Sequence, residues 1–478
     1  MRELTRSEVR QQLEAGFPRL EPPRSAVVVG AGLAGLAAAR ELHRAGCNVT
    51  VLEASERPGG RALTLRDPFA DGLRAEAGAM TVTPHCDYVT HYRKLLGVEL
   101  DRSDLLDQDF SYFVNGRFVR ADPASLAEAG LPLAEHERGM SVTDMIERYV
   151  TAVAEELGPG LAAPDWAPAA ELEHLDRASV QEVLRGRGAS QAAIDLMEPL
   201  FLEMRGGDLR SASALSWLRH ESGHRSLLGE VDGWGKIAGG TDVLPQAFAG
   251  ELRERIRYRS PVVRLEQDDD TVTVTYLDHG RLATATADRV VVTVPFSAMR
   301  HVDVSHAGLS EAKIDVMRRL RYASIVRVYL QMRRQFWEGH NVSVSTDLPV
   351  RWVRDASASQ PGPRRILEVL MTGWRSRAVA AMTEEERLDF VLGHVESMFP
   401  GAREHYELGL SVAWDHQPWI EGSYVLPERG HGKLMPAIRA PEGRIHFAGE
   451  HTSYEPNGGS MSYALESGVR AFVELAAA

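Results

Sequence analysis

The sequence has 478 residues, of which 44% are hydrophobic and 25% charged, and its net charge is −13 at pH 7. Length and composition predict a globular protein of roughly two or three domains, while the acidic balance disfavours nucleic acids and anionic membrane surfaces as partners. The sequence has only two cysteines, Cys47 and Cys86, which are too few for a disulfide framework. Because we find neither about 18 consecutive apolar residues nor a signal-peptide core, we expect a cytoplasmic protein without a membrane span.

The start of the chain predicts a strand, a helix and a second strand. Residues 26–29 form an apolar run typical of a buried strand, a helix rich in Ala and Leu is expected over about 32–45, and the second strand ends at Glu53. Residues 84–230 carry helical patterns, whereas residues 255–295 alternate apolar and polar side chains as strands do. The other predicted elements are a helix with an extended lead-in over 1–24, a Pro/Ala-rich loop over 158–170, a strand over 322–332, and a final helix over about 460–475.

Predicted nucleotide-binding elements lie at both ends of the chain and in its middle. We therefore expect an α/β fold in which a discontinuous Rossmann-like domain is joined to a mixed-sheet substrate domain with a helical subdomain. The predicted division assigns 1–83, 236–297 and 430–478 to the nucleotide-binding domain, and 84–235 and 298–429 to the substrate domain.

A G-x-G-x-x-G motif joins the first predicted strand to its helix. Gly30 permits a tight turn, Gly32 lets the backbone approach a pyrophosphate, and Gly35 allows the helix to pack closely on the strand. Glu53 ends the next strand, where a carboxylate accepts hydrogen bonds from ribose hydroxyls and repels a 2′-phosphate. The motif and its flanking elements therefore predict a dinucleotide site.

The string ERPGGR at 56–61 extends this motif, with Gly60 for a second close backbone approach and Arg61 to pair with the pyrophosphate. Further matching strings are EAGAM (76–80), SPVVRLEQ (260–267) and HFAGEHTSYEPNGGSMSYALESGVRAF (446–472). This collinear series covers nearly the whole chain and resembles the flavin-dependent amine oxidase family, the group of monoamine oxidases and L-amino acid oxidases. The resemblance implies a Rossmann-like FAD-binding domain with FAD as the cofactor.

The resemblance also implies which residues contact FAD. Val263 would contact adenine through its backbone, Glu450 would bind the ribityl or phosphate region, and the helix that opens at Gly459–Met461 would direct its positive end at the flavin. Ser423 precedes Tyr424 where the monoamine oxidases carry a thioether-forming cysteine, so we expect non-covalent FAD. The implied cofactor-binding set is Gly30, Gly32, Ala34, Gly35, Glu53, Ala54, Gly60, Arg61, Gly78, Ala79, Met80, Val263, Trp419, Gly449, Glu450, Gly459, Ser460 and Met461.

Two positions are implied as catalytic, Tyr424 and Arg327. Tyr424 matches one of the two aromatic rings that flank the flavin in the family, whereas the second position maps to Ser460, which Tyr454 or Tyr463 could replace. Arg327 stands where the family usually has a lysine that holds a water against flavin N5. An arginine stays charged and cannot act as a general base, but it can donate hydrogen bonds.

The substrate pocket departs from the L-amino acid oxidases at Thr81. These enzymes have an arginine directly after GAM that grips the α-carboxylate, and here that position is Thr81. Either the substrate lacks an α-carboxylate, or another arginine such as Arg205 or Arg327 supplies the charge. The expected substrate-binding residues are Thr81, Arg205, Tyr424 and Ser460.

The predicted function is FAD-dependent oxidation of an amine. Hydride would pass from the substrate Cα to flavin N5, the imine would hydrolyse to a carbonyl, and O2 would be reduced to H2O2. The alternatives are a desaturase or a dehydrogenase on the same scaffold, and a catalytically idle FAD-binding protein. We expect a small-molecule amine as substrate, no nucleic acid, no membrane and no metal, with a homodimer left open.

Overall fold

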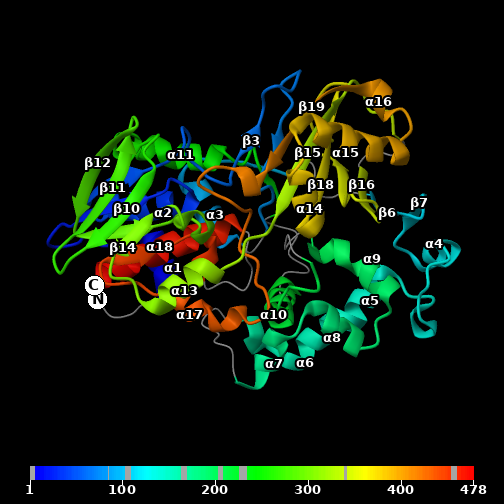
Figure 1. The fold of residues 1–478 in the computed structure, drawn as a ribbon, viewed down its shortest axis with the longest axis horizontal. Helices are drawn as coiled ribbons and strands as arrows, with labels where there is room; N and C mark the ends of the chain where they lie inside the picture. The colour runs from blue at the N-terminus through cyan, green and yellow to red at the C-terminus, as the bar shows by residue number, and fades with distance from the viewer. Residues whose placement is uncertain are drawn as a thin grey trace.

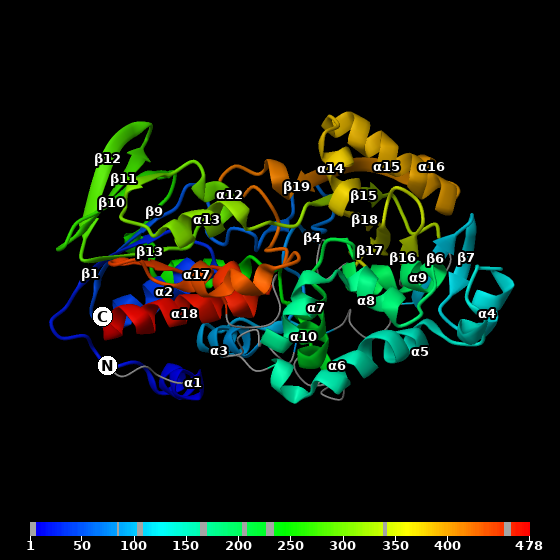
Figure 2. The same ribbon diagram turned by 60° about the horizontal axis from the view of Figure 1, so that its bottom comes forward.

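The computed structural model describes residues 6–83, 86–102, 109–162, 170–202, 208–225, 234–337, 342–453 and 460–478. Figure 1 shows an elongated arrangement in which one end holds a parallel sheet and its covering helices. The other end holds a mixed sheet above a group of helices, and the turned view in Figure 2 places the same groups at the same ends.

The parallel sheet is assembled from three distant parts of the chain. Its strands are short apolar runs buried on both faces, as is usual for parallel sheets. Val27 lies opposite Thr50 on one side and Val290 on the other. This arrangement confirms the expected α/β fold with a Rossmann-like sheet. The strand order is β20 (Ile445–Phe447), β13 (Arg289–Val292), β1 (Ser25–Val29), β2 (Asn48–Leu52) and β9 (Ile256–Arg257).

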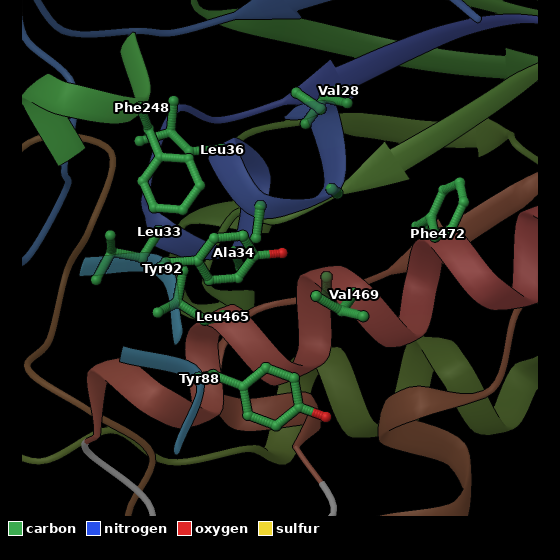
Figure 3. Packing of buried hydrophobic residues seen from close by; sticks show 14 of the residues in the cluster. Val28, Leu33, Ala34, Leu36, Tyr88, Tyr92, Phe248, Leu465, Val469 and Phe472 are labelled. Carbon is green, nitrogen blue, oxygen red and sulfur yellow. The ribbon is translucent and has the colours of Figure 1, made fainter. Parts of the chain in front are cut away.

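Two helices pack closely on each other beside this sheet, α2 (Leu33–Arg44) and α18 (Met461–Ala477). The absence of a side chain at Gly468 of α18 permits the approach, because a Cβ there would lie only 2.2 Å from the carbonyl oxygen of Ala34 in α2. Figure 3 shows Leu465 of α18 directed towards α2 in the core that these helices share. The other helices at this end are α1 (Arg6–Ala15), α3 (Asp87–Leu95) and α11 (Val243–Glu251).

A four-stranded sheet flanks the parallel sheet. Its strands β10 and β11 shift in register between Val262 and Arg264, which leaves Val263 in a bulge of the ladder. The strand order is β12 (Arg281–Ala287), β11 (Val272–Asp278), β10 (Val262–Gln267) and β14 (Asp303–His306). The helices nearby are α12 (Phe296–Met299), α13 (Glu311–Arg319) and α17 (Met435–Arg439).

The mixed sheet at the other end has seven strands. Strands β6 and β7 at one side of the sheet lie inside residues 84–230, where the sequence predicts helices, so that prediction is wrong for these strands. Their sequence, DFSYFVNGRFVR, reads as a hairpin with a turn at Asn115 and Gly116, both at positive φ. The strand order is β19 (Tyr406–Ala413), β15 (Ile325–Met332), β18 (Arg365–Thr372), β17 (Trp352–Asp355), β16 (Val342–Thr346), β6 (Asp109–Val114) and β7 (Arg117–Arg120).

The two faces of this sheet differ in chemistry because side chains alternate along each strand. On one face, Val326 and Val328 of β15 join an apolar core with Val391 and Leu392 of the covering helices. The opposite face carries Arg327 and buried polar partners. The covering helices are α14 (Gly373–Ala380), α15 (Glu384–Met398) and α16 (Ala402–His405).

A group of helices lies below the mixed sheet and has its own core around Tyr149, Met197 and Trp217. Ser141 and Ser179 begin two of these helices with capping boxes, as their spacing to Asp144 and Glu182 predicts. The helices are α4 (Pro123–Glu128), α5 (Val142–Ile146), α6 (Ala152–Leu157), α7 (Glu173–Arg177), α8 (Val180–Gly186), α9 (Gln191–Leu202) and α10 (Ala214–Arg225). Two short strand pairs complete the described elements, β3 (Thr64–Leu65) with β4 (Ala75–Glu76) and β5 (Leu100–Asp101) with β8 (Lys236–Ile237).

Candidate cofactor and active site

The three glycines of the first motif have different surroundings. Gly30 has φ +103°, and a Cβ there would lie 2.6 Å from Thr293 Oγ1. A Cβ at Gly35 would lie 2.0 Å from the Gly30 carbonyl oxygen, so this glycine permits helix α2 to contact the turn. A Cβ at Gly32 would meet no described atom within 4 Å, and Gly32 gives α2 no side-chain cap. The N-terminus of α2 therefore faces open space, with backbone N–H groups suited to an anion.

A second glycine turn lies against the first. Gly59 N–H donates to the Ala31 carbonyl at 2.8 Å, and a Cβ at Gly60, which has φ +55°, would lie 3.7 Å from the Cα of Gly32. The Arg57 guanidinium holds the turn by donating to the Gly60 carbonyl at 2.7 Å. Sequence reasoning missed Arg57, although its place between Glu53 and the glycine pair was a usable signal.

Glu53 follows β2 directly and organises the neighbouring loops. Its carboxylate accepts from Ala31 N–H at 2.7 Å and from Ser55 N–H at 2.8 Å. Its carbonyl accepts from Ser260 N–H at 2.8 Å, which brings the segment before Val263 to the same edge of the sheet. Ala54 is half-buried in the same loop.

Arg61 and Glu450, far apart in sequence, form an ion pair. Arg61 Nη1 lies 3.0 Å from Glu450 Oε1, and the same nitrogen donates to the Ser423 carbonyl. Glu450 Oε1 also accepts from Val425 N–H at 2.9 Å. Gly449, at φ +121°, donates its N–H to the Ser467 hydroxyl of α18. The pair thus joins the second glycine turn, the strand end before Glu450 and the loop before Tyr424.

The segment Gly78–Met80 passes between the glycine turn and the mixed sheet. A Cβ at Gly78 would lie 1.8 Å from the Arg61 carbonyl oxygen, so only glycine fits. Trp414 Nε1–H donates to the Ala77 carbonyl at 2.8 Å, and Thr241 donates to the Ala79 carbonyl at 2.9 Å. Met80 contacts the guanidinium of Arg354 through its sulfur.

Arg327 lies on the face of the mixed sheet that meets this segment. Its Nη1 donates to the Glu76 carbonyl at 3.1 Å and lies 2.9 Å from Glu368 Oε1, while Arg354 contacts the other oxygen of Glu368. Although burial opposes the charge, the Glu368 carboxylate raises the pKa of Arg327 above its ordinary range, so the guanidinium stays protonated. Sequence reasoning missed Glu368 and Arg354, whose positions become informative only through strand register.

Tyr424 is half-buried and packs on a small apolar cluster beside Arg327, made of Ala323, Ile325, Trp352 and Leu370. Trp419 is 44% exposed, at φ +66°. Thr81 is half-buried after Met80. At the start of α18, Ser460 accepts from Ser462 N–H at 3.2 Å, and Met461 and Tyr463 are buried. The predicted residues Arg205, Tyr454 and Gly459 lie outside the described residues.

These features fit a flavin dinucleotide. Open space at Gly32 beside an uncapped helix N-terminus suits the pyrophosphate, the carboxylate of Glu53 suits ribose, and the bulge at Val263 leaves backbone groups outside the ladder. Within the described ranges, no three His, Cys, Asp or Glu side chains are grouped as they would be around a metal ion. None of the described helices combines the length and apolar character needed to cross a membrane.

The chain belongs to the family of flavin containing amine oxidoreductases, whose model matches residues 33–475. It is therefore a flavin-dependent amine oxidoreductase by family, and the resemblance noted from the sequence motifs is confirmed. Among its relatives are the putative L-amino-acid oxidase YobN of Bacillus subtilis, 29% identical with 99% of each chain covered, and the L-amino-acid oxidase of Siganus canaliculatus, 29% identical with 96% of this chain and 87% of that protein covered.

Solved structures share the fold. Cyclohexylamine oxidase from Brevibacterium oxydans superimposes with a TM-score of 0.79 at 24% identity, covering 95% of this chain and 99% of that one. Wild-type putrescine oxidase bound to putrescine gives a TM-score of 0.79 at 21% identity, with the same coverage. At these identities the likeness establishes the architecture and no more.

Proposed function

We propose that this protein oxidises the C–N bond of an amine with non-covalently bound FAD and uses O2 as the electron acceptor. The observation that supports this most directly is the position of the segment Gly78–Met80. It is fixed on one side to Arg61 of the glycine turns and on the other to the Arg354 and Glu368 cluster of the mixed sheet. A cofactor held by the glycine turns would therefore lie beside the polar face of that sheet.

The residues that would hold FAD come from all three parts of the proposed cofactor domain, 1–83, 236–297 and 430–478. The N-terminus of α2 would bind the pyrophosphate, Glu53 the adenosine ribose, and Val263 the adenine. The start of α18 would face the flavin with its positive end. When bound, FAD accepts a hydride from the substrate carbon and passes the electrons on to O2.

The proposed pocket keeps the substrate amine neutral. Arg327 and Arg354 share the single carboxylate of Glu368, and a positive surplus in a buried site disfavours an ammonium ion. Water would be excluded from this pocket by the apolar cluster beside Arg327, which includes Trp352, Leu370 and Tyr424. Loss of hydride from the neutral amine gives an imine, which water hydrolyses to a carbonyl compound.

Arg327 takes no proton in this scheme because its pKa is raised, and its role is to position groups by donating hydrogen bonds. Replacement of the family's lysine by this arginine favours a second candidate, a dehydrogenase with an acceptor other than O2.

Purification followed by an amine panel tests the proposal. We expect a yellow protein whose flavin is released by acid precipitation, because Ser423 cannot form a thioether. At least one amine should abolish the visible absorbance of the oxidised flavin under anaerobic conditions. Admission of air should restore this absorbance and release one H2O2 for each flavin that is reoxidised. Bleaching without recovery in air would identify a dehydrogenase, and a protein that stays colourless after refolding with FAD would contradict both candidates.

A further inference from the structure

Strand β12 forms one edge of the four-stranded sheet, and Figure 1 shows it on the outer side of the molecule. Strand β11 pairs with it on one side, and within the described part of the chain no strand pairs with it on the other. Its seven residues, RLATATA, contain no proline and no charge after Arg281. Edge strands usually carry charged side chains, a proline or a covering segment that prevents further pairing. Strand β12 is therefore open to pairing with another strand.

Other edges of the protein are protected. In β19, an edge of the mixed sheet, Ser411 N–H donates to the Glu384 carboxylate of α15 at 2.7 Å, so a side chain occupies part of that edge. At the opposite edge of the same sheet, β7 has only four residues and an arginine at each end. Strand β12 is longer than β7 and has neither kind of protection along its length. This contrast marks β12 as an interaction surface.

The turn before β12 decides which of its backbone groups point outwards. The two central residues of the turn have φ +48° and +80°, the geometry of a type I′ turn. Asp278 and Arg281 flank this turn as a hydrogen-bonded pair, and such pairs alternate with pairs that share no hydrogen bond. Leu277 and Leu282 are therefore a pair of the second kind. In agreement, Leu277 N–H donates to the Pro261 carbonyl on the other side of β11, at 3.0 Å.

The same alternation places Thr284 and Thr286 with Leu282, so these three residues direct their N–H and C=O groups away from β11. These six groups have no hydrogen-bond partner among the described residues. The three side chains are exposed, and that of Leu282 is the most exposed large hydrophobic one described, at 72%. Ala283 and Ala285, between them, pack against the core on the other face. The edge thus presents three donors and three acceptors in one line, beside uncharged side chains.

We infer that β12 pairs with β12 of a second copy of this chain, antiparallel and about a two-fold axis at Thr284. In this arrangement Thr284 lies opposite Thr284 of the partner subunit, and Leu282 lies opposite Thr286 of the partner subunit. All the outward-facing residues then meet each other, so the six groups of each strand find partners. The two four-stranded sheets become one continuous sheet, as a self-complementary contact between identical chains requires.

The charges at the ends of the strand favour this register. With the axis one residue later, Arg281 would face Arg289 of the partner subunit. With the axis one residue earlier, Asp278 would face Asp288 of the partner subunit. Like charges directly opposite each other destabilise a pair of strands. The axis at Thr284 avoids both contacts, which makes a second copy of this chain the occupant that the edge fits.

The mass of the purified protein in solution tests the inference, and this test does not depend on the proposed amine oxidation. By sedimentation equilibrium, we expect the wild-type protein to have twice the mass of one chain and Thr284→Pro to have the mass of one chain. Proline removes the N–H at the axis, which points away from β11, so the hairpin keeps its own ladder. Melting temperature and FAD content show whether the variant is folded. A wild-type protein that is a monomer throughout the concentration range overturns the inference, whatever Thr284→Pro does.

Two charged variants test whether Thr284 faces itself. Thr284→Lys and Thr284→Glu each bring like charges together at the axis, so each alone should raise the dissociation constant of the dimer, by roughly fivefold. An equimolar mixture should recover the dimer, because a lysine then faces a glutamate. Thr273→Lys is the matched control, since Thr273 lies opposite Thr286 on β11, one strand away from the edge, and it should dimerise as the wild type does.

Two results with folded variants would contradict the pairing of β12 with itself. Dimers that persist unchanged in Thr284→Pro, Thr284→Lys and Thr284→Glu would form through another surface. A loss of dimers in the two charged variants that their mixture does not reverse would mean that Thr284 does not lie at the axis. Recovery in the mixture, with normal dimers in Thr273→Lys, supports the inference.

Discussion

Gly30, Gly32 and Gly35 belong to one motif, yet each is required for a different physical reason. Gly30 needs its positive φ, and Gly35 needs the absence of a Cβ that would meet the Gly30 carbonyl, whereas a Cβ at Gly32 would meet no described atom within 4 Å. The fold itself does not require a glycine at position 32, which leaves the proposed approach of the pyrophosphate as its reason. Folding and cofactor binding should therefore be separable within six residues of sequence.

Gly32→Ala and Gly35→Ala should have different effects. The unfolding free energy of the Gly32→Ala apoprotein should lie within about 0.5 kcal/mol of the wild-type value. The φ of Gly32 is −69°, which alanine adopts readily, and the added methyl group would meet no described atom within 4 Å. Its FAD affinity should fall at least roughly tenfold, since the methyl group occupies the approach of the pyrophosphate. Gly35→Ala should destabilise the apoprotein itself. Urea unfolding and FAD titration measure the two properties, and equal loss of stability in both variants would contradict this assignment.

Arg327 should control the reaction with O2. Arg327→Ala removes a partly buried cation beside the Glu76 carbonyl and leaves Arg354 and Glu368 as a balanced pair. We expect the rate at which the reduced enzyme reacts with O2 to change at least roughly tenfold, about 1.4 kcal/mol of barrier. Stopped-flow mixing with aerated buffer measures this rate, and Arg327→Lys serves as the charge-preserving comparison. An unchanged rate in Arg327→Ala would remove this residue from the mechanism.

At the scale of elements, the contact between α2 and α18 positions both ends of the cofactor site. The first helix begins directly after Gly32, and the second begins directly after Ser460. Their axes approach closely because Gly468 meets the Ala34 carbonyl without a side chain between them. A change at this contact should therefore alter cofactor binding from a distance.

Gly468→Ala should lower both the melting temperature and FAD retention, because its Cβ would lie 2.2 Å from a backbone oxygen that cannot move freely. Gly250→Ala in α11 is the matched control, since a Cβ there meets nothing within 4 Å. Replacement of a helical glycine with open surroundings should stabilise by about 0.5–1 kcal/mol. Differential scanning fluorimetry compares the two, and a Gly468→Ala protein as stable as Gly250→Ala would refute the packing argument.

At the scale of the whole molecule, the free energy of unfolding should depend on pH because of one buried lysine, Lys313. Lys313 of α13 donates to the Ile438 and Ala440 carbonyls at the end of α17 and lies 3.9 Å from the Phe447 ring centre. Burial lowers the pKa of Lys313 to about 7. The pKa of a lysine in the unfolded chain is about 10.4. Between pH 7 and about 10 the unfolded chain therefore binds more protons at this site than the folded chain does, so the free energy of unfolding rises with pH.

Lys313→Met should abolish this dependence. The unfolding free energy of wild type minus that of Lys313→Met should be about 2–3 kcal/mol greater at pH 9 than at pH 6.5. Urea unfolding at both pH values measures it, with Lys433→Met, which removes an exposed lysine from an ion pair with Glu173, as the comparison. If the difference in unfolding free energy between wild type and Lys313→Met were the same at both pH values, the two carbonyls and the Phe447 ring would be keeping the Lys313 ammonium charged.

Sequence alone predicted the parts of this molecule that depend on local signals. The glycine motif, the strand ending at Glu53 and the final helix follow from short-range sterics and periodicity, and the structure places them at Ser25–Leu52 and Met461–Ala477. The hairpin β6–β7 was missed because it lies within a mainly helical region. The pairing of Arg354 with Glu368 could not be predicted, since it depends on register between strands that only tertiary packing fixes.

Strand β13 of the parallel sheet has β1 on one side and β20 on the other, and these two neighbours come from opposite ends of the described chain. A nascent chain leaving the ribosome can pair β1 with β2 early, but it cannot complete this sheet before β20 has been synthesised. A cofactor that binds through all three parts of the chain should therefore be captured only after β20 has joined the sheet.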